Sequence, residues 1–408
     1  MHPPTTSAPR ARAQLPPHVY LLALGTFFIG TDVFAIAGML PALSASLDVS
    51  LSAAGQLMTV FSLSYAVLGP VLSTVLSRWS PRTCVTGALC AVAAGNLVCA
   101  GAPSLMVAFL GRVLVAAGAC QFTPHVAALA AASVTEQRRG RALAVVNGGL
   151  VAGSVIGVPA STWAAEATNW RISLTLLGLG TAVVASALVS GLRGHAECPR
   201  PMSLREQLGT LRSPQVRLLL SVTALAVVAE YSLLTYAGAV FAPATGHDGG
   251  RLGLLLLVFG VGGLVGNSAA GAFLDRPMGR HLVLLSLAGM AVAFLVMPWT
   301  TTCYPAALVC VALWGIAGWM YATPQQHRLL RQSGPAGPLA VSVNSSVIYL
   351  GGAAGGALGG ALLAWLPDHW TPLPAAALCA LAVVPELLFR RREPVTARPI
   401  REPRPTPR

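Results

Sequence analysis

The sequence contains no lysine, and this absence alone removes several kinds of chemistry. All 26 basic residues among the 408 are arginine, and only 13 residues are acidic. Without lysine the chain cannot build the Gly-Lys-Ser/Thr loop that holds nucleotide phosphates, or form a Schiff base with a carbonyl substrate. We therefore expect no ATP-binding P-loop, so the energy for any uphill process must come from an ion gradient or from a partner.

Charge of either sign is scarce, and motifs for metal binding are absent. Charged residues make up 10% of the chain and hydrophobic residues 55%, whereas about 25% of a soluble domain is charged. The eight cysteines form no CxxC or Cys/His cluster, and no HExxH occurs. We therefore expect no metal site, no disulfide framework and no membrane-embedded enzyme. The high apolar fraction also excludes a disordered chain.

Long apolar stretches fill almost the whole chain. A helix that crosses a bilayer needs about 20 consecutive apolar residues. Twelve stretches meet this requirement, at about 19–40, 53–76, 82–101, 104–133, 140–163, 170–191, 215–241, 250–273, 280–298, 303–325, 337–363 and 370–389. We predict an all-α membrane protein with twelve transmembrane helices.

The polar segment between the sixth and seventh stretches divides the chain into two sets of six. We predict two pseudosymmetric six-helix bundles, at 18–191 and 215–389, joined by a cytoplasmic linker at 192–214. Two polar tails complete the chain, one at 1–17 and a basic one at 390–408.

The arginines are distributed very unevenly between the two sides of the predicted membrane. If the spans alternate, 23 of the 26 arginines fall on one side; the other side holds only Arg171 and Arg251, and Arg112 lies within a span. Positively charged loops mark the cytoplasmic side. We therefore predict a multi-pass protein of the cell membrane with both termini in the cytoplasm. A basic tail is also compatible with nucleic-acid binding, but we favour a solvated tail and expect no nucleic-acid partner.

The two halves repeat at an offset of 198 residues. This offset places Asp32 on Glu230, and these are the two acids deep within apolar stretches. It also places Arg78 on Arg276, Gly153 on Gly351 and Gly157 on Gly355. Parallel repeats of six helices occur in transporters whose substrate site lies near the membrane midplane, between the halves.

Three ionisable residues lie well inside the predicted spans: Asp32, Arg112 and Glu230. A charge in hydrocarbon costs at least about 2.5–3.5 kcal/mol, so such residues face a cavity or a partner. Asp32 and Arg112 both lie roughly 12 Å from the outer ends of their spans at 1.5 Å per residue, so they can pair. One interpretation is that Asp32 or Glu230 carries a proton during transport; the other is a static salt bridge between helices.

Several short motifs, taken in their order along 18–390, resemble those of the major facilitator superfamily. Within it, the chain is most similar to the bacterial twelve-helix drug:proton antiporters, including chloramphenicol-resistance and sugar- or purine-efflux exporters. The motifs that carry the resemblance are Gly30–Phe34 with Gly38–Pro41, Gly69–Arg78, Gly111–Val113, Gly153–Pro159, Trp170–Arg171, Gly266–Arg276 and Asn344–Ser346. The acid of the first motif usually precedes a phenylalanine directly, whereas Val33 follows Asp32 here.

The resemblance implies a function. It implies a secondary transporter that exports a small drug-like molecule or metabolite in exchange for protons by alternating access, with Asp32, Glu230 and Arg112 in proton coupling. No cofactor is expected, because the proton gradient supplies the energy, and a monomer is expected. The alternative is a proton-coupled symporter that imports a sugar or nucleoside.

The resemblance also implies gating loops and a glycine motif. The gating candidates are Arg78, Arg82, Asp275 and Arg276; in the first loop Ser77 replaces the expected acid, and Ser80-Pro81 replaces Gly-Arg. Small residues that recur every fourth position let two helices approach closely. This pattern, which in the family marks antiporters, comprises Gly149, Gly153, Gly157 and Pro159, with Gly351 and Gly355 in the second half.

Small-molecule sites combine apolar surface with a few polar groups, and several residues in the spans are of these types. The candidates for the substrate cavity are Phe61, Tyr65, Gln121, Phe122, His125, Asn147, Tyr231, Tyr236, Trp314 and Trp319. No further charge lies well inside the spans, so we expect a neutral or weakly polar substrate.

Overall fold

A computed structural model describes residues 15–191 and 209–392, and within these ranges the chain forms helices and no strands. Most of the predicted linker and tails therefore lies outside the described residues. The first half comprises α1 (Pro17–Ser46), α2 (Leu51–Val75), η1 (Leu76–Arg78), α3 (Pro81–Ala100), α4 (Leu105–Ala132), α5 (Glu136–Ala152), the π-helical η2 (Gly153–Gly157), α6 (Val158–Ala167) and α7 (Trp170–Gly191).

The second half is built in the same way. It comprises η3 (Thr210–Arg212), α9 (Pro214–Leu234), α10 (Ala237–Val240), α11 (Ala242–Thr245), α12 (Gly249–Phe273), η4 (Pro277–His281), α13 (Leu282–Thr300), α14 (Tyr304–Met320), α15 (Ala322–Ser333), η5 (Gly334–Ala336), α16 (Gly337–Trp365), η6 (Asp368–Trp370) and α17 (Pro372–Arg392).

Length and hydropathy identify 11 described segments that can cross a membrane. One of them, Tyr304–Trp365, is 62 residues long, about three times the length that a bilayer requires. It contains both α14–α15 and α16. Counting these two separately gives twelve crossings, so the prediction of twelve helices in two bundles is confirmed.

Polar side chains set the starts of several helices. The hydroxyl groups of Ser50 and Ser80 accept hydrogen bonds from backbone N–H groups in the first turns of α2 and α3. The carboxylate of Asp248 acts in the same way at the start of α12, where it accepts a hydrogen bond from the Arg251 N–H at 2.8 Å. Such caps satisfy N–H groups that a helix leaves unpaired at its start.

The seventh predicted span, 215–241, ends earlier than expected. α9 stops at Leu234, and the chain continues in the single turns α10 and α11. Tyr236 lies at the break, and its hydroxyl donates to the Gly356 carbonyl at 2.9 Å. Anchoring this side chain to α16 accounts for a break that the uniformly apolar sequence does not show.

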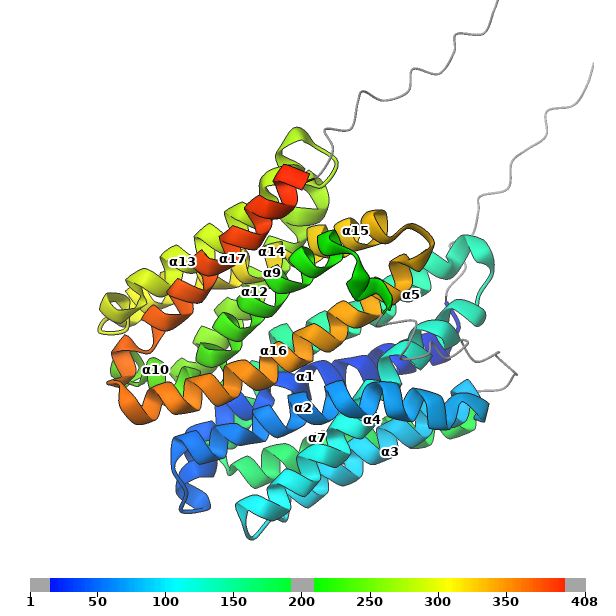
Figure 1. The fold of residues 1–408 in the computed structure, drawn as a ribbon. Coiled ribbons are helices and arrows are strands. Elements are labelled where there is room, and N and C mark those ends of the chain that lie inside the picture. The colour runs from blue at the N-terminus through cyan, green and yellow to red at the C-terminus, as the bar shows by residue number, and fades with distance from the viewer. Residues whose placement is uncertain (1–14, 192–208, 393–408) are drawn as a thin grey trace, which may run out of the picture.

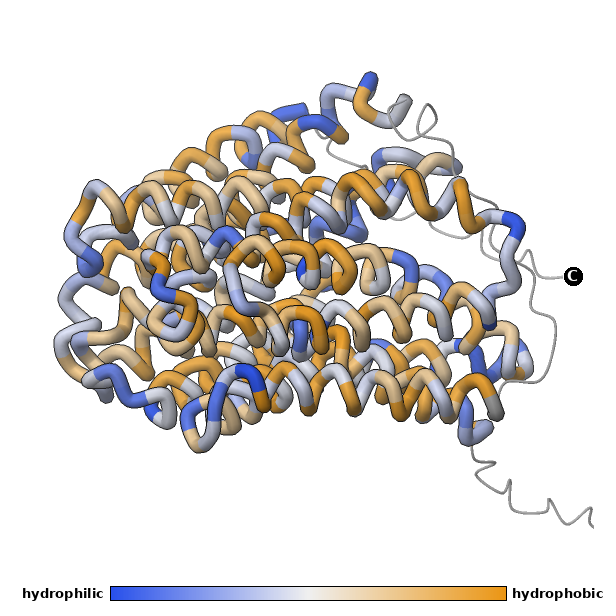
Figure 2. Tube along the Cα trace, turned by 90° about the horizontal axis from the view of Figure 1, so that it is seen from below, coloured by the Kyte–Doolittle hydropathy of each residue, from blue (hydrophilic) through white to orange (hydrophobic). Residues whose placement is uncertain are grey.

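The two halves lie side by side, and both ends of the described chain emerge on the same side (Figure 1). We call this side the termini face and the other side the opposite face. Hydrophobic residues predominate along the helices, while hydrophilic residues gather near the ends (Figure 2). The halves meet where α16 packs on α2, α12 on α6 and α10 on α1.

α5 and η2 pack closely on α1 through the predicted glycines. A Cβ atom on Gly149 would lie 2.1 Å from the Ala23 carbonyl oxygen, and one on Gly153 would lie 2.2 Å from the Phe27 carbonyl oxygen. Both neighbours are backbone atoms, so they cannot rotate away. In this half the glycine pattern therefore creates backbone contact between two helices.

The two adjacent glycines of α5 give a matched test of this contact. Gly149→Ala should lower the thermal unfolding temperature of the purified protein, because an extra methyl group against a backbone oxygen costs about 1–3 kcal/mol. Gly148→Ala is the control, because a Cβ there meets no atom within 4 Å and alanine favours a helix. Equal unfolding temperatures for the two variants would contradict the proposed close contact.

α16 carries two rows of glycines that face different neighbours. Gly351, Gly355 and Gly359 face α9 within the same half, where Cβ atoms would approach Val227, Val228 and Ser232. Gly352, Gly356 and Gly360 form the second row. Gly356 and Gly360 lie against Thr59, Ser52 and Gln56 of α2 in the other half. α16 therefore joins the two halves through its backbone.

Candidate functional site

The structure brings two of the predicted membrane charges together. Asp32 of α1 is 2% exposed and Arg112 of α4 is 0% exposed. The Arg112 Nη1 donates to both carboxylate oxygens of Asp32 at 3.2 Å. The guanidinium also lies over the Phe61 ring, 4.5 Å from its centroid, a favourable arrangement for a cation.

The surroundings of this pair contain polar groups that lack partners. Asn96 of α3 is fully buried and lies beside Asp32. Within the described part of the chain, both polar atoms of Asn96 and the Nε and Nη2 of Arg112 have no hydrogen-bond partner. Native structures leave few buried polar groups unpaired, so the unpaired atoms around this ion pair are unusual.

Glu230 occupies the corresponding place in α9 but has different neighbours. It is 7% exposed, and its carboxylate lies against Gly318 of α14. The offset of 198 places Cys310, an uncharged residue, where the first half has Arg112. Within residues 15–191 and 209–392 the structure shows no ion pair or hydrogen bond for Glu230. The repeat therefore conserves the acid but not its cation.

A third buried acid was not predicted. Glu386 of α17 is 0% exposed and forms ion pairs with Arg328 of α15 at 2.9 Å and with Arg390 at 2.8 Å. Arg328 and Arg390 also donate to the Arg280 carbonyl in η4. Glu386 lies near the end of α17, so it adds a buried acid to the two that the sequence places deep within apolar stretches. The network ties α15, α17 and η4 together at the termini face.

The predicted gating residues take part in few of these contacts. Arg78 and Asp275 are exposed, and Arg276 lies over the Phe273 ring at 4.9 Å. Arg82 donates to the Val189 carbonyl of α7, which fixes the start of α3. In the second half, Arg328 and Arg390 contact η4, whereas Asp275 forms no ion pair in the described residues.

Several predicted cavity residues lie within one half instead of between the halves. Phe122 is fully buried against Gly25 of α1. Trp314 is 1% exposed and packs on Phe259 and Phe294 of its own half. In the first half, Gln121 is bonded to the Gly69 carbonyl and His125 to the Gln121 carbonyl. Phe61 lies under Arg112 but also contacts Tyr349 of α16 in the second half, with ring centroids 6.4 Å apart.

Other predicted residues do lie between the halves. Tyr65 of α2 stacks on Tyr349 of α16, with ring centroids 3.5 Å apart. Tyr231 of α9 contacts Phe34 of α1, with centroids 5.9 Å apart. Tyr236 also reaches the first half, because its hydroxyl lies 3.4 Å from the Ser52 carbonyl of α2, and Trp319 lines a pocket with Phe34. Asn147 is exposed on α5. Phe34 and Tyr349 were not predicted for this surface.

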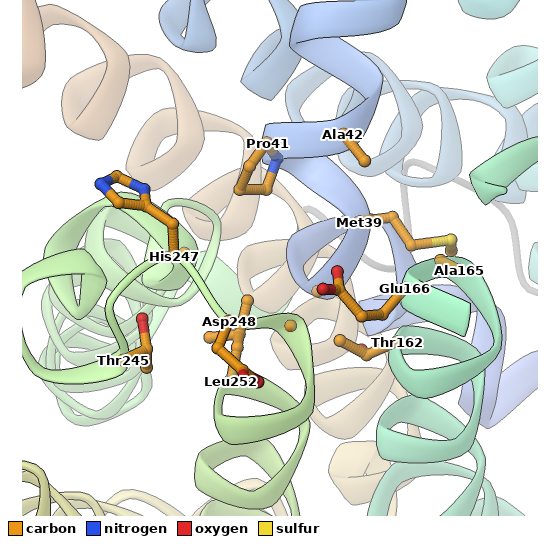
Figure 3. A pocket seen from close by; sticks show the side chains of 13 residues that line it. Met39, Pro41, Ala42, Thr162, Ala165, Glu166, Thr245, His247, Asp248 and Leu252 are labelled. Atoms are coloured by element: carbon orange, nitrogen blue, oxygen red, sulfur yellow. The ribbon is translucent and has the colours of Figure 1, made fainter. Parts of the chain in front are cut away.

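The opposite face is closed by contacts between the halves. The Trp163 indole N–H of α6 donates to the Gly250 carbonyl of α12 at 3.0 Å. The Glu166 side chain lies against Gly249 at the start of α12. Figure 3 shows Glu166 reaching into a small pocket between α6, α1 and the segment that leads into α12.

The contacts of Trp163 and Glu166 of α6 with α12 lie at the start of α12, which is at the opposite face. Toward the termini face, polar side chains are exposed within the spans, including Asn147 of α5, Ser268 of α12 and Ser345 of α16. Polar groups at such positions generally face protein or water instead of lipid. The halves are thus closed together at the opposite face and present polar residues toward the termini face.

Two repeated six-helix halves with charges buried within the spans are an arrangement found in membrane transporters. The family model of the Major Facilitator Superfamily matches residues 22–337. The chain therefore belongs to the Major Facilitator Superfamily, and the resemblance seen in its motifs is confirmed. It is a multi-pass membrane transporter for small molecules and not an enzyme.

Individual relatives agree with this assignment. The chain is 32% identical to the inner membrane transport protein YdhP of Escherichia coli O157:H7, with 92% of this chain and 96% of that protein covered. It is 28% identical to a chloramphenicol resistance protein of Streptomyces lividans, with 92% and 97% covered. A bacterial homologue of the human lysosomal transporter Spinster, solved inward-facing and occupied, matches with a TM-score of 0.74, 17% identity, and 92% and 96% coverage.

Proposed function

We propose that this transporter exports a small drug-like molecule or metabolite across the cytoplasmic membrane in exchange for protons, by alternating access. The observation that carries the proposal is the buried pair of Asp32 and Arg112, 3.2 Å apart within the spans. A buried ion pair contributes little net stability. Its presence is better explained by a carboxylate that gains and loses a proton during the cycle.

The geometry supports a simple sequence of events. While Asp32 is ionised, it holds α1 to α4 through Arg112. A proton on Asp32 removes this attraction and leaves the Arg112 guanidinium without an anionic partner. α1 is then free to shift against α6 and α12, the elements that close the opposite face. No cofactor takes part, because the proton gradient supplies the energy.

The distribution of arginine supports a cytoplasmic location of the termini face, because positive charge accumulates in cytoplasmic loops. Under this orientation the halves are closed together at the outer face, and the exposed polar side chains of the spans lie toward the cytoplasm. An exporter takes up its substrate from that side. We also propose that one chain is the working unit, because both halves and the surface between them come from a single chain.

Transport in cells tests the function and its direction. Cells that express the protein should accumulate less labelled chloramphenicol than cells with an empty vector, and a proton uncoupler should remove the difference. A panel of antibiotics extends the same comparison to other compounds. Uncoupler-sensitive accumulation of a labelled sugar or nucleoside above the control would instead support the symporter, and contradict export.

A further inference from the structure

A histidine at the termini face is approached by more hydrogen-bond donors than it can accept. The Arg280 Nε donates to the His281 Nε2 at 2.8 Å, and the Arg390 Nη1 lies 3.2 Å from the His281 Nδ1. A neutral imidazole has one nitrogen lone pair, because its other nitrogen carries a proton, and a protonated imidazole has none. At least one of these two guanidinium N–H groups therefore meets His281 without finding an acceptor there.

Positive charge exceeds negative charge around this histidine. We call Arg280, His281, Arg328, Glu386 and Arg390 the basic cluster. Its carboxylate, Glu386, already pairs with Arg328 and Arg390, and both arginines also donate to the Arg280 carbonyl, whose two lone pairs are then used. In the described part of the chain, the Arg280 guanidinium forms no ion pair. The basic cluster thus has an excess of donors and of positive charge.

The repeated fold does not require this cluster. The offset of 198 residues places Thr83 at the position of the histidine, Ala130 at that of the buried arginine and Leu188 at that of the acid. Arg82, the counterpart of Arg280, donates to a backbone carbonyl of α7 instead. Since the first half packs without the cluster, packing alone does not explain it. Arginine groups that lack an acceptor are typical of a site for phosphate or carboxylate.

The basic cluster lies where an exposed apolar surface of the second half ends. Arg280 and His281 are exposed just before α13, and Leu285, one turn further along, is 53% exposed. On α17, Leu387 lies one turn before Arg390 and is 45% exposed. α13 and α17 pack on each other, and both lie on the side of the second half away from the first half (Figure 1). Apolar surface that lipid can cover therefore adjoins the unbalanced positive charge.

We propose that the basic cluster binds the phosphate group of an anionic phospholipid. The phosphate oxygens accept hydrogen bonds from Arg280, His281 and Arg390 together, and supply the acceptor that the imidazole lacks. The acyl chains lie over Leu285 and Leu387. The buried ion pairs beneath the site hold its arginines in place. The termini face carries the excess of arginine that marks the cytoplasmic side, where anionic lipids accumulate.

Binding of single lipid molecules tests the site without requiring transport. The full chain, purified in detergent, is titrated with phosphatidylglycerol or with phosphatidylcholine of the same acyl chains, and bound lipid is counted by native mass spectrometry. The first phosphatidylglycerol should bind at least about tenfold more tightly, because it carries a net negative charge and phosphatidylcholine does not. Equal affinities for the two lipids would overturn the proposal.

Variants of single arginines locate the site. Arg280→Gln removes an exposed side chain that does not pair with the buried acid, and should weaken phosphatidylglycerol binding about fivefold. Arg390→Gln should do the same while the ion pair of Arg328 and Glu386 remains. Arg139→Gln is the matched control, because Arg139 is exposed in the first turn of α5 on the same predicted side of the membrane. Unchanged binding in Arg280→Gln, or an equal loss in Arg139→Gln, would contradict the site.

Thermal unfolding distinguishes a lipid from soluble phosphate. Phosphatidylglycerol should raise the unfolding temperature of the unmodified protein and should raise that of Arg280→Gln less, because a ligand of the folded state stabilises it. Inorganic phosphate, compared with chloride at equal ionic strength, should give no such rise, because it has no acyl chains to cover the apolar surface. A rise with inorganic phosphate equal to that with the lipid would overturn the assignment to a lipid.

Discussion

Asp32→Asn is expected to reduce proton-driven transport to the level of protein-free vesicles while the protein stays folded in the membrane. Asparagine has nearly the shape of aspartate and keeps an oxygen that accepts from Arg112, but it cannot bind and release a proton. The measurement is uptake of labelled chloramphenicol into proteoliposomes under an imposed pH gradient, with proton movement followed by a pH-sensitive dye.

Asp48→Asn is the matched control for this variant. Asp48 is exposed in the loop after α1 and has a φ angle of +52°, a conformation that asparagine adopts readily. Its transport should equal that of the unmodified protein. Gradient-driven transport in Asp32→Asn at the unmodified rate would show that Asp32 does not carry the proton.

Arg112→Leu is expected to lower stability strongly. It would leave Asp32 ionised without a partner at a site that is 2% exposed, and breaking a buried ion pair on one side costs about 3–5 kcal/mol. The double variant Asp32→Asn, Arg112→Leu should recover most of this stability, because no lone charge remains. Thermal unfolding of the purified proteins, together with their yield in membranes, measures both effects.

Measurements of transport distinguish the effect of these variants on function from their effect on stability. The double variant should remain inactive in gradient-driven uptake even where its unfolding temperature is restored. Arg331→Leu serves as the control for loss of an arginine, because Arg331 is exposed on α15. An Arg112→Leu protein as stable as the unmodified one would mean that the pair is dispensable for folding.

The number of spans and the pairing of Asp32 with Arg112 could be predicted because both depend on length along a helix. Apolar runs of about 20 residues mark the spans, and a fixed rise per residue gives depth in the membrane. The repeat of 198 residues then located Glu230. None of these steps requires knowledge of which way a side chain points around its helix.

The residues between the halves could not be predicted equally well, because this requires knowing which way each side chain points around its helix axis. The spans are apolar on all sides, so their sequence does not distinguish the side facing lipid from the side facing the other half. Phe122 and Trp314 have the same chemical character as Phe34 and Tyr349 but lie within a half. Only the packing of the helices separates the two groups.

Glu386 was overlooked for a different reason. It lies four residues before Arg390 at the end of α17, where a charge needs no explanation because the end of a span is near water. Its main partner, Arg328, lies 58 residues away in α15, a helix that the sequence predicted to end at 325 but that continues to Ser333. The added turns of α15 bring Arg328 to Glu386.

The π-helical η2 determines which side of α6 meets the second half. A π-helical turn holds one residue more than the α-helix around it, so every residue after Gly157 is rotated by about 100° from the position that an uninterrupted helix would give it. Trp163 and Glu166, which contact α12, both lie in this rotated register. One extra residue in a single turn thus lets one helix pack its glycines on α1 at one end and present its closing side chains to α12 at the other.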